Sequence, residues 1–532
     1  MTTHAYLFEA KSIQSFILST NRLKEIVGAS ELVESLTGSL DEQAATSLLD
    51  DALEAIGKPD IYFSRRGGAT FYAFSQDKEA IDDLATLWPL LVRQYAPDLE
   101  FTQASGKGGD DYFAFENTHK KLLANRNRPV ARLPQAGPFI RRNRRTGEPA
   151  CCFSHSKKLK EPEPIDIATS RKLDFSKAHQ LAKRFDPQST SANWPVLLTP
   201  EEGQEGKTFP FIGDNRTIAL IHADGNGLGE ALRKLQDHAK QHPEDYLELF
   251  SGFSRAVGIA TQKAAQRATE ETLSNHKQDG LYPARPIVLG GDDLTIIVRA
   301  DLALEFTREF LLAFAEESLN ELKPLREQEK FTFLPEQLTA CAGIAYAKSS
   351  QPFYLLHGLA EGLCKQAKSK AKKINPVGLS ALSFHRIITA MVDDYQDILE
   401  RELTIPTGQT PTHHRQTLEC YTLEKVQGLP NLKDLTDLRD LLGGKNMARG
   451  PTRQVLGLIG QDYQQAKRRY QRWRAIVEKD KLQAFDDLLG RLLGNKIRSD
   501  LPYGDAVAYG KTDSLSATPL GDVINLLAIQ GE

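Results

Sequence analysis

Hydrophobic and polar positions follow the same order in two parts of the chain. In residues 217–373, apolar runs typical of buried strands alternate with segments whose apolar residues recur at helical spacing. The pattern predicts a strand at 217–223, helices from 228 and over 246–273, a hairpin at 286–298, a helix at 303–319, a strand at 338–349 and a helix at 354–373. This order, β-α-α-β-β-α-β-α, is that of a ferredoxin-like sheet with one additional helix.

The N-terminal part predicts the same order. Its strands are expected at 5–11 and 98–105, its hairpin at 60–75, and its helices over 12–40 with a break near Gly28, over 78–95 and over 112–126. The two hairpin sequences, SRRGGATFYAF and VLGGDDLTII, align on a pair of glycines. We interpret this similarity as an internal duplication of one domain.

The remaining segments have other patterns. Residues 127–210 are rich in proline, arginine and lysine and show little regularity. A linker is indicated by the composition of residues 406–414, PTGQTPTHH. The pattern of the sequence after this linker is mostly helical. The segment YQQAKRRYQRWRAIVEKD predicts a basic helix whose Tyr463, Tyr470 and Trp473 we expect to pack rather than to dock a partner subunit.

We therefore predict an α+β fold with four domains. Two are ferredoxin-like domains of the kind found in polymerase palms and nucleotide cyclases. The predicted domains are a degenerate palm at 1–126, an irregular insertion at 127–210, a second palm at 211–395 and an α-helical domain at 396–532.

Composition and charge agree with a large globular protein. The 532 residues exceed what one hydrophobic core supports, and 40% hydrophobic with 26% charged residues excludes a disordered or fibrous chain. The net charge of −3 means that nucleic acid would have to bind at local basic patches. No apolar run is long enough to span a membrane, no signal-peptide pattern is present, and five cysteines without CxxC pairs are typical of a cytoplasmic protein.

The hairpin at 286–298 contains two adjacent carboxylates at its turn. The sequence PIVLGGDDLTIIVRA places Asp292 and Asp293 directly after Gly290 and Gly291. Glycine and aspartate are ordinary turn residues, so a purely structural turn is one interpretation. The other is a metal site, because carboxylates on a tight turn can hold Mg²⁺ against a nucleotide triphosphate.

The first strand of the same domain supplies a third carboxylate. Asp224 follows the strand at 217–223, in the sequence HADGNGLG. In a ferredoxin-like sheet this strand neighbours the hairpin, so the three carboxylates would meet and repel one another unless cations were bound. Gly225 and Gly227, like the two hairpin glycines, would let a triphosphate approach bare backbone. We therefore favour a site for two Mg²⁺ or Mn²⁺ ions.

The N-terminal copy keeps the glycine pair but lacks the acidic residues. Ala69 and Thr70 stand where the second copy has its two aspartates, and Ala10 stands at the position of Asp224. We predict that this copy is inert and shapes the wall of one nucleotide pocket.

The helix predicted at 354–373 contains a row of lysines. Lys365, Lys368 and Lys372 are spaced to share one face, and apolar residues occupy the other side. A solvated surface is one interpretation of such a row. The other is contact with a triphosphate, because the helix follows a strand of the same sheet, and we expect Lys368 to bind phosphate.

Four ordered motifs, HADGNGLG, LGGDD, TACAGIAYA and AEGLCKQAKSKAK, resemble the large subunit of type III CRISPR effector complexes. Members of that family are RNA-activated cyclic oligoadenylate synthetases related to GGDEF cyclases. The segment SIQSFILSTNRLKEIVGASELV resembles its first, inert palm domain. The resemblance implies that ATP is joined 3′–5′ into cyclic oligoadenylate, with guide RNA, target RNA and other effector subunits as partners.

The same resemblance implies roles for individual residues. Asp224, Asp292 and Asp293 match the metal-binding aspartates of the family. Lys368 matches its triphosphate-binding lysine, because the stretch from Ala360 to Lys368 has the spacing of the corresponding cyclase helix.

Two features depart from the family. Many members begin with an HD nuclease domain, whereas this sequence starts on the first palm and contains no His-Asp dipeptide, so we expect no DNase activity. The zinc-binding insertion is reduced to Cys151, Cys152 and His155. Adjacent cysteines do not easily supply the separated ligands of a tetrahedral site, so we expect no zinc.

Basic residues gather around the start of the insertion, at Arg126, Arg128, Arg132, Arg141, Arg142, Arg144 and Arg145. They would either contact phosphates of guide or target RNA or form a solvated loop, and the sequence favours neither interpretation.

Two other functions are compatible with the same motifs. One is a stand-alone defence cyclase that makes a cyclic dinucleotide without guide RNA. The other is a scaffold subunit whose ATP site only binds nucleotide, and the three intact aspartates argue against it.

Overall fold

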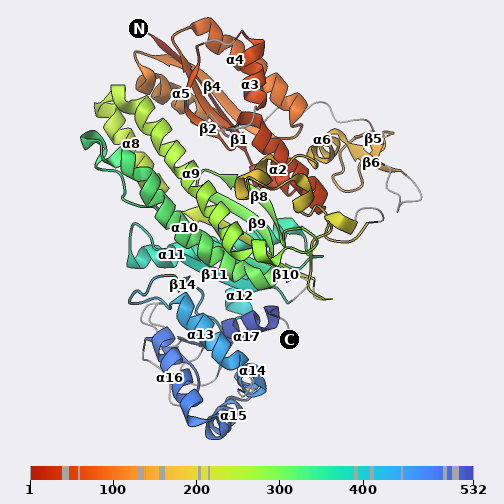
Figure 1. Ribbon diagram of the computed structural model, residues 1–532, viewed down its shortest axis with the longest axis vertical. Helices are drawn as coiled ribbons and strands as arrows, with labels where there is room; N and C mark the ends of the chain where they lie inside the picture. The colour runs from red at the N-terminus through yellow and green to blue at the C-terminus, as the bar shows by residue number, and fades with distance from the viewer. Residues whose placement is uncertain are drawn as a thin grey trace. The chain divides into compact units, whose positions relative to one another are not determined.

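The computed structural model describes residues 2–38, 47–57, 60–128, 137, 139–154, 162–201, 205–213, 216–388, 394–407, 413–444, 447, 449–494, 500–505 and 515–530. Helices and sheets are mixed along the chain (Figure 1), which confirms the α+β class. The chain forms two compact units. Unit 1 comprises residues 1–210, 228–296 and 316–338, and unit 2 comprises residues 211–227, 297–315 and 339–532. Within the described ranges, no helix has the length and apolar character needed to span a membrane.

The N-terminal part of unit 1 contains a four-stranded antiparallel sheet. Its strands are β1 (Thr3–Lys11), β2 (Tyr62–Gly67), β3 (Thr70–Ser75) and β4 (Glu100–Gly108), in the order β2-β3-β1-β4. β1 lies in the centre, where Leu7 faces Tyr72 on one side and Ala104 on the other. This strand order is that of the ferredoxin-like fold.

Alternation along β1 divides its side chains between two helices. Phe8 contacts Trp88 of α4 (Lys78–Tyr95), and this tryptophan is fully buried. Leu7 belongs instead to a cluster with Phe115 of α5 (Asp111–Asn125). Because successive residues of a strand point to opposite faces, α4 and α5 cover opposite faces of the sheet.

The helical break predicted near Gly28 is wrong. The chain forms α1 (Ile13–Ile17) and α2 (Leu23–Thr37), and α2 runs through Gly28 without interruption. A Cβ atom at Gly28 would lie 1.6 Å from the carbonyl oxygen of Lys172 in α6 (Ile167–Phe175). The glycine therefore permits close helix packing and does not end the helix. Unit 1 also contains α3 (Leu48–Ala55), which begins with a capping box at Ser47.

The insertion is more regular than its composition predicts. Besides α6 it contains β5 (Ala150–Ser154) and β6 (Glu163–Asp166), which pair antiparallel, and α7 (Gln180–Phe185). Short 3-10 turns follow at Ser191–Asn193 and Glu205–Lys207. These elements were not predicted from the arginine- and proline-rich sequence, because they are short and weakly periodic.

A second, larger sheet is formed by strands between residues 217 and 422. Its strands are β7 (Thr217–Gly225), β8 (Ala284–Gly290), β9 (Asp293–Arg299), β10 (Ala340–Lys348), β11 (Ala381–Arg386) and β14 (Tyr421–Thr422), in the order β14-β11-β10-β7-β9-β8. Its helices are α8 (Leu228–Gln241), α9 (Tyr246–Thr272), α10 (Ala300–Arg326) and α11 (Phe353–Ile374), and short 3-10 turns lie at Pro243–Asp245, Ser274–His276 and Glu329–Phe331. The first four strands in sequence take the same 2-3-1-4 order as β1 to β4, and β11 and β14 extend the sheet.

The C-terminal region of unit 2 combines helices with a small sheet. The helices are α12 (Tyr395–Arg401), α13 (Leu432–Gly443), α14 (Arg449–Leu458), α15 (Tyr463–Ile476), α16 (Lys479–Leu493) and α17 (Leu520–Ile529). The strands β12 (Thr404–Pro406), β13 (His413–Arg415), β15 (Gly504–Asp505) and β16 (Leu515–Ala517) form a sheet in the order β12-β13-β16-β15. The region is mostly helical, as predicted, but the small sheet was not expected, and the described ends of the expected linker are paired strands. The predicted domain boundaries stay a prediction.

Aromatic and acidic side chains of this region are buried. Tyr470 and Trp473 of α15 are buried, as expected for packed aromatic residues. Asp522 of α17 is also buried, and its carboxylate accepts hydrogen bonds from the Leu418 backbone N–H and the Thr417 hydroxyl, each at 3.0 Å, and from the Tyr421 hydroxyl.

Candidate active site

The two glycines before Asp292 make the tight turn between β8 and β9. Gly291 has a φ of +60°, a conformation that side chains rarely adopt. The hydroxyl of Thr261 in α9 donates a hydrogen bond of 2.6 Å to the Gly291 carbonyl. Asp292 and Asp293 follow at once and are half-buried. The turn (Gly290–Asp293, called the GGDD turn below) therefore presents both carboxylates from a backbone held by a helix.

Asp224 lies near the end of β7, opposite Cys341 of the antiparallel strand β10. The next turn is fixed by Asn226, which is buried. Its backbone N–H donates to the Thr339 carbonyl at 2.7 Å, and its side-chain amide donates to the Leu379 carbonyl at 3.1 Å. Sequence reasoning did not single out Asn226, although its place between two glycines was the available signal.

The three aspartates form a group with ligand-type geometry. One carboxylate oxygen from each of Asp224, Asp292 and Asp293 lies within 4.8 Å of the other two. Hard divalent cations bind carboxylate oxygens, and three such ligands suit Mg²⁺ or Mn²⁺.

A second group within the described ranges differs in its surroundings. It consists of His242, Glu244 and Asp245. Asp245 already pairs with Lys330 at 2.8 Å and with His238 at 2.9 Å. His242 and Glu244 are exposed, and the group does not line the cavity that contains Gly290, Gly291 and Asp292, so it is the weaker candidate for a cation that binds nucleotide.

The three lysines of α11 have different environments. Lys365 and Lys372 are exposed, whereas Lys368 is only 18% exposed. The Lys368 ammonium donates to the Asp224 carboxylate and, at 2.8 Å, to the Gly225 carbonyl. Packing of Ala367 and Ala371 into the core of unit 2 sets this rotation of the helix. Lys368 is therefore the lysine of the row that is directed at a candidate metal ligand.

Buried histidines behind Asp224 add no positive charge at neutral pH. His222 of β7 lies against His357 of α11, with ring centres 5.4 Å apart. Burial lowers the pKa of His222 to about 4. Lys368 thus supplies a positive charge that directly contacts Asp224.

A cavity of about 570 Å³ in unit 1 connects the GGDD turn to the N-terminal copy. Its wall includes Gly290, Gly291 and Asp292 from one hairpin and residues 64–68 from the other. The volume falls within the range of small-molecule pockets, roughly 300–1,000 Å³. A Cβ atom at Gly290 would lie 3.8 Å from the Cα of Gly68, so the glycine pairs of the two hairpins face each other.

The N-terminal hairpin contributes no carboxylate to this cavity. Ala69 is fully buried at a φ of +55°, and Thr70 is buried beside it. Glu9, Tyr72 and Arg65 of the same sheet do reach the cavity wall. The N-terminal copy thus contributes polar and aromatic surface.

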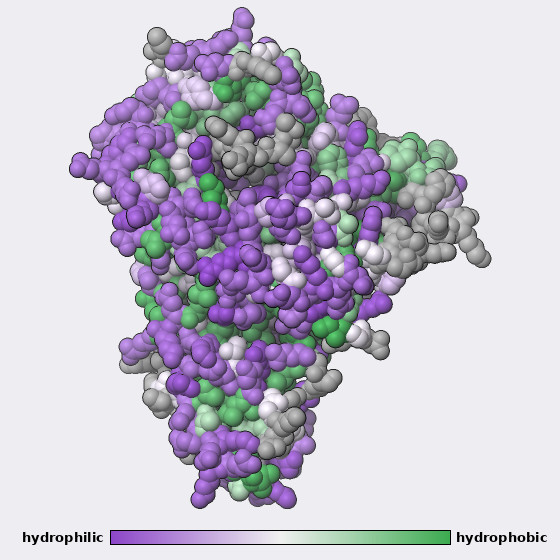
Figure 2. All heavy atoms as spheres, in the orientation of Figure 1, coloured by the Kyte–Doolittle hydropathy of each residue, from purple (hydrophilic) through white to green (hydrophobic). Residues whose placement is uncertain are grey.

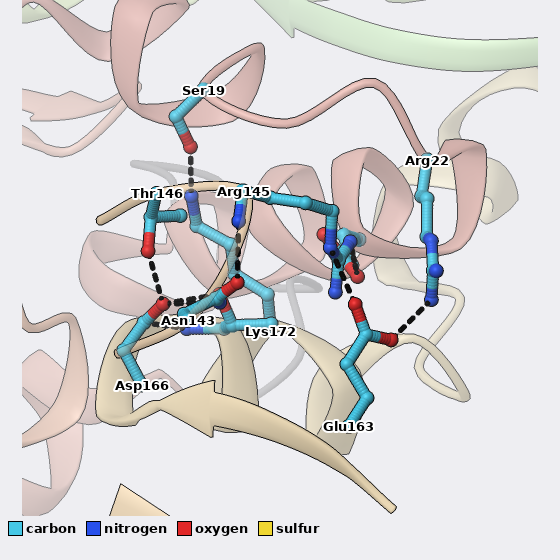
Figure 3. Close-up of polar contacts among 10 residues, drawn as sticks. Ser19, Arg22, Asn143, Arg145, Thr146, Glu163, Asp166 and Lys172 are labelled. Atoms are coloured by element: carbon cyan, nitrogen blue, oxygen red, sulfur yellow. Dashed lines mark hydrogen bonds and ion pairs between the residues drawn. The ribbon is translucent and has the colours of Figure 1, made fainter. Parts of the chain in front are cut away.

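The arginines around the start of the insertion have two kinds of environment, because one is ion-paired inside unit 1 and the others described are exposed. Arg145 pairs with buried Glu25 of α2 and, at 3.2 Å, with Glu163 of β6, which also pairs with Arg22 (Figure 3). Arg145 is therefore neither a solvated residue nor an available RNA contact. Arg126, Arg128, Arg141, Arg142 and Arg144 are exposed, and Arg132 lies outside the described residues.

The same network fastens α6 to the N-terminal helices. The Lys172 ammonium donates to the Phe16 carbonyl at 2.6 Å and to the Ser19 hydroxyl at 2.7 Å, and burial lowers its pKa to about 8. Asp166 accepts from Asn143 at 2.6 Å (Figure 3). Buried polar groups with such partners order the insertion against α2.

Two of the three residues that remain of the zinc-binding insertion, Cys151 and Cys152, lie in β5 of the β5–β6 hairpin. The sulfur atoms of Cys151 and Cys152 are 3.4 Å apart, and His155 lies outside the described residues. Hydrophobic side chains are visible at this hairpin in Figure 2, and Phe153 is 46% exposed.

Comparison with known proteins identifies the second palm. Residues 217–375 match the family model described as Cas10/Cmr2, second palm domain. This segment is therefore similar to the second palm domain of Cas10/Cmr2 proteins. The match includes β7, the GGDD turn and α11, and it confirms the family resemblance inferred from the four motifs.

Solved structures resemble this chain more distantly. The Csm1–Csm4 cassette in complex with cA4 is 12% identical, with a TM-score of 0.46, over 100% of this chain and 70% of that one. The cassette with AMPPNP is 12% identical, with a TM-score of 0.45, over 90% and 64%. Csm1 of T. onnurineus is 14% identical, with a TM-score of 0.44, over 100% and 70%. These similarities are too distant to assign residues or activity. No match was found among curated proteins.

Proposed function

We propose that this chain is a metal-dependent nucleotidyltransferase that joins ATP 3′–5′ into cyclic oligoadenylate. The observation that supports this most directly is the group formed by Asp224, Asp292 and Asp293 inside a Cas10-like palm. Three carboxylates at such distances repel one another, and a divalent cation removes that repulsion. Their oxygen chemistry suits two Mg²⁺ or Mn²⁺ ions, which when bound would activate a ribose hydroxyl and neutralise the departing pyrophosphate.

The chain's own residues have separate tasks in this proposal. Asp224, Asp292 and Asp293 bind the ions. Gly290 and Gly291 let a triphosphate approach the backbone without steric conflict. Lys368, whose ammonium contacts the Asp224 carboxylate, would pair with the phosphates of a bound nucleotide and stabilise the charge that develops on pyrophosphate.

The cavity between the two hairpins accommodates nucleotide. Its wall combines the GGDD turn with Glu9, Arg65 and Tyr72 of the N-terminal copy. One nucleotide presents its α-phosphate at the aspartates, and a second presents its 3′-hydroxyl from the side of the inert copy. No side-chain nucleophile is required in this reaction.

We further propose that the chain works as the large subunit of a type III CRISPR effector complex. Guide RNA, target RNA and other effector subunits are its partners, and target RNA activates synthesis. The Cas10-like palm supports this assignment, together with the N-terminal motif that resembles an inert first palm.

The decisive experiment incubates the purified chain with ATP and Mg²⁺ or Mn²⁺, alone and after assembly with co-purified subunits, guide RNA and target RNA. We expect cyclic oligoadenylate that depends on metal and increases with target RNA. A cyclic dinucleotide made equally well without RNA would indicate a stand-alone cyclase. ATP binding without any product would indicate a scaffold subunit.

A further inference from the structure

The edge strand that leads into the GGDD turn is held by residues that the proposed chemistry does not use. β8 is the last strand of the six-stranded sheet, so one side of its backbone pairs with no strand in the part of the chain that the structure describes. Near its end, the carbonyl of Leu289 accepts a hydrogen bond of 2.6 Å from the guanidinium of Arg184 in α7. This contact lies three residues before Asp292.

Arg184 is itself fixed by two other partners. Its guanidinium donates to Glu34 of α2 at 3.0 Å and to the side chain of Gln262 in α9 at 3.1 Å. Arg184 also lines the cavity, and its side chain is only 21% exposed. One planar group thus connects the insertion, the first palm and the strand before the GGDD turn.

The beginning of β8 is held by the same helix. Glu31, one turn before Glu34 on α2, lies 3.4 Å from the guanidinium of Arg285, and both side chains are buried. The second oxygen of Glu31 accepts from the Leu181 backbone N–H at 3.1 Å, which fixes the start of α7. Two carboxylates of α2 therefore hold β8 near both ends, one directly and one through Arg184.

We propose that Arg184 is a positioning residue that sets the backbone of the GGDD turn. Through Glu34, the inert palm determines the placement of Asp292. A guanidinium suits this task because its rigid planar donors can serve Leu289, Glu34 and Gln262 together, whereas an ammonium offers no such fork. Thr261 supports the same turn from α9 by its bond to Gly291. This inference rests on the proposed function only in taking the turn as the metal site.

The test measures the turn directly, by hydrogen–deuterium exchange of the full chain over residues 286–298. We expect Arg184→Ala to speed exchange there by about tenfold, the change that corresponds to losing one charge-assisted hydrogen bond. Arg184→Lys and Glu34→Gln should give smaller increases. Lys183→Ala is the matched control, because Lys183 is the exposed neighbour on the same helix and its replacement should leave exchange unchanged.

Activity and metal binding provide the second measurement. With ATP and Mn²⁺, Arg184→Ala should lower kcat and raise the Mn²⁺ concentration needed for half-maximal rate, with little change in KM for ATP. Wild-type exchange in Arg184→Ala would overturn the inference, even if activity were lost. If the wild type made no product while Arg184→Ala still loosened the turn, the proposed function would fail and the positioning role would stand.

Discussion

Lys368 offers the sharpest test of the proposed site, because its environment differs from those of its neighbours on α11. Its ammonium contacts the Asp224 carboxylate and the Gly225 carbonyl. Lys368→Met removes the charge and keeps most of the side-chain length. Two consequences follow: Asp224 no longer has a competing cation in the absence of nucleotide, and the triphosphate loses a positive charge when it binds.

The magnitude depends on how far solvent screens the charge. Side-chain exposures of 18% for Lys368 and 36% for Asp224 place the pair between a surface pair and a buried one. A surface pair contributes about 0–1 kcal/mol, and two unit charges 4 Å apart at an effective dielectric constant of 20 interact by about 4 kcal/mol. We expect a loss of about 2–3 kcal/mol of transition-state stabilisation, the scale of losing one charge-stabilising donor. This corresponds to a kcat/KM lower by roughly 30- to 150-fold.

The assay compares kcat/KM for ATP in the wild type, Lys368→Met and Lys368→Arg, with Lys365→Met and Lys372→Met as matched controls. Lys365 and Lys372 are exposed on the same helix, so their variants should stay close to wild type. Lys368→Arg should be partly active, because a planar fork replaces a compact charge. Calorimetry should show tighter Mn²⁺ binding by nucleotide-free Lys368→Met. Equal, mild effects of all three methionine variants would refute the reasoning and mark the row as a solvated or RNA-facing surface.

Three further predictions concern other parts of the chain. Asp292→Ala with Asp293→Ala should abolish product while far-UV circular dichroism and Tm stay near wild type, and wild-type turnover by this variant would contradict the metal assignment. Ala69→Asp with Thr70→Asp should create no second active site. This double variant should also lower Tm, because it buries two charges without partners at a cost of at least about 2–3 kcal/mol. An unchanged Tm would argue against the burial of these positions. Burial raises the pKa of Asp522 to about 7, above its unfolded value of about 3.9. The folded state therefore binds this proton more tightly than the unfolded state does. The free energy of unfolding consequently falls as the pH rises from about 4 through 7. Asp522→Asn should flatten that loss in thermal melts between pH 5 and 8, and a pH profile identical to wild type would rule out Asp522 as its source.

Local sequence patterns were sufficient for the main elements and for the chemical type of the site. The strand and helix order of both palms follows from apolar periodicity, since each segment must bury its own apolar side. The GGDD turn was also predictable, because its glycines and aspartates are adjacent in sequence. The replacement of both aspartates by Ala69 and Thr70 in the N-terminal copy was equally visible.

Tertiary packing decided the features that depend on distant partners. Gly28 suggested a helical break, but a backbone carbonyl of α6, far away in sequence, approaches it and makes the glycine a packing residue. Arg145 belonged to a basic run that looked like one solvated or RNA-binding loop, and only folding showed its buried partner, Glu25. The strands β12, β13, β15 and β16 are two or three residues long, too short to produce a periodic signal.

The lysines of α11 show the same division between sequence and structure. Helical spacing placed Lys365, Lys368 and Lys372 on one face, but the rotation of the helix about its axis selects the one that reaches Asp224. Ala367 and Ala371 set that rotation by packing beside Cys341 of β10. Arg184 likewise contacts Leu289 only because α2, α7 and β8 pack together. Periodicity records how a segment buries its own apolar side chains, whereas the pairing of charges across the chain depends on the packing of whole elements, which no local pattern contains.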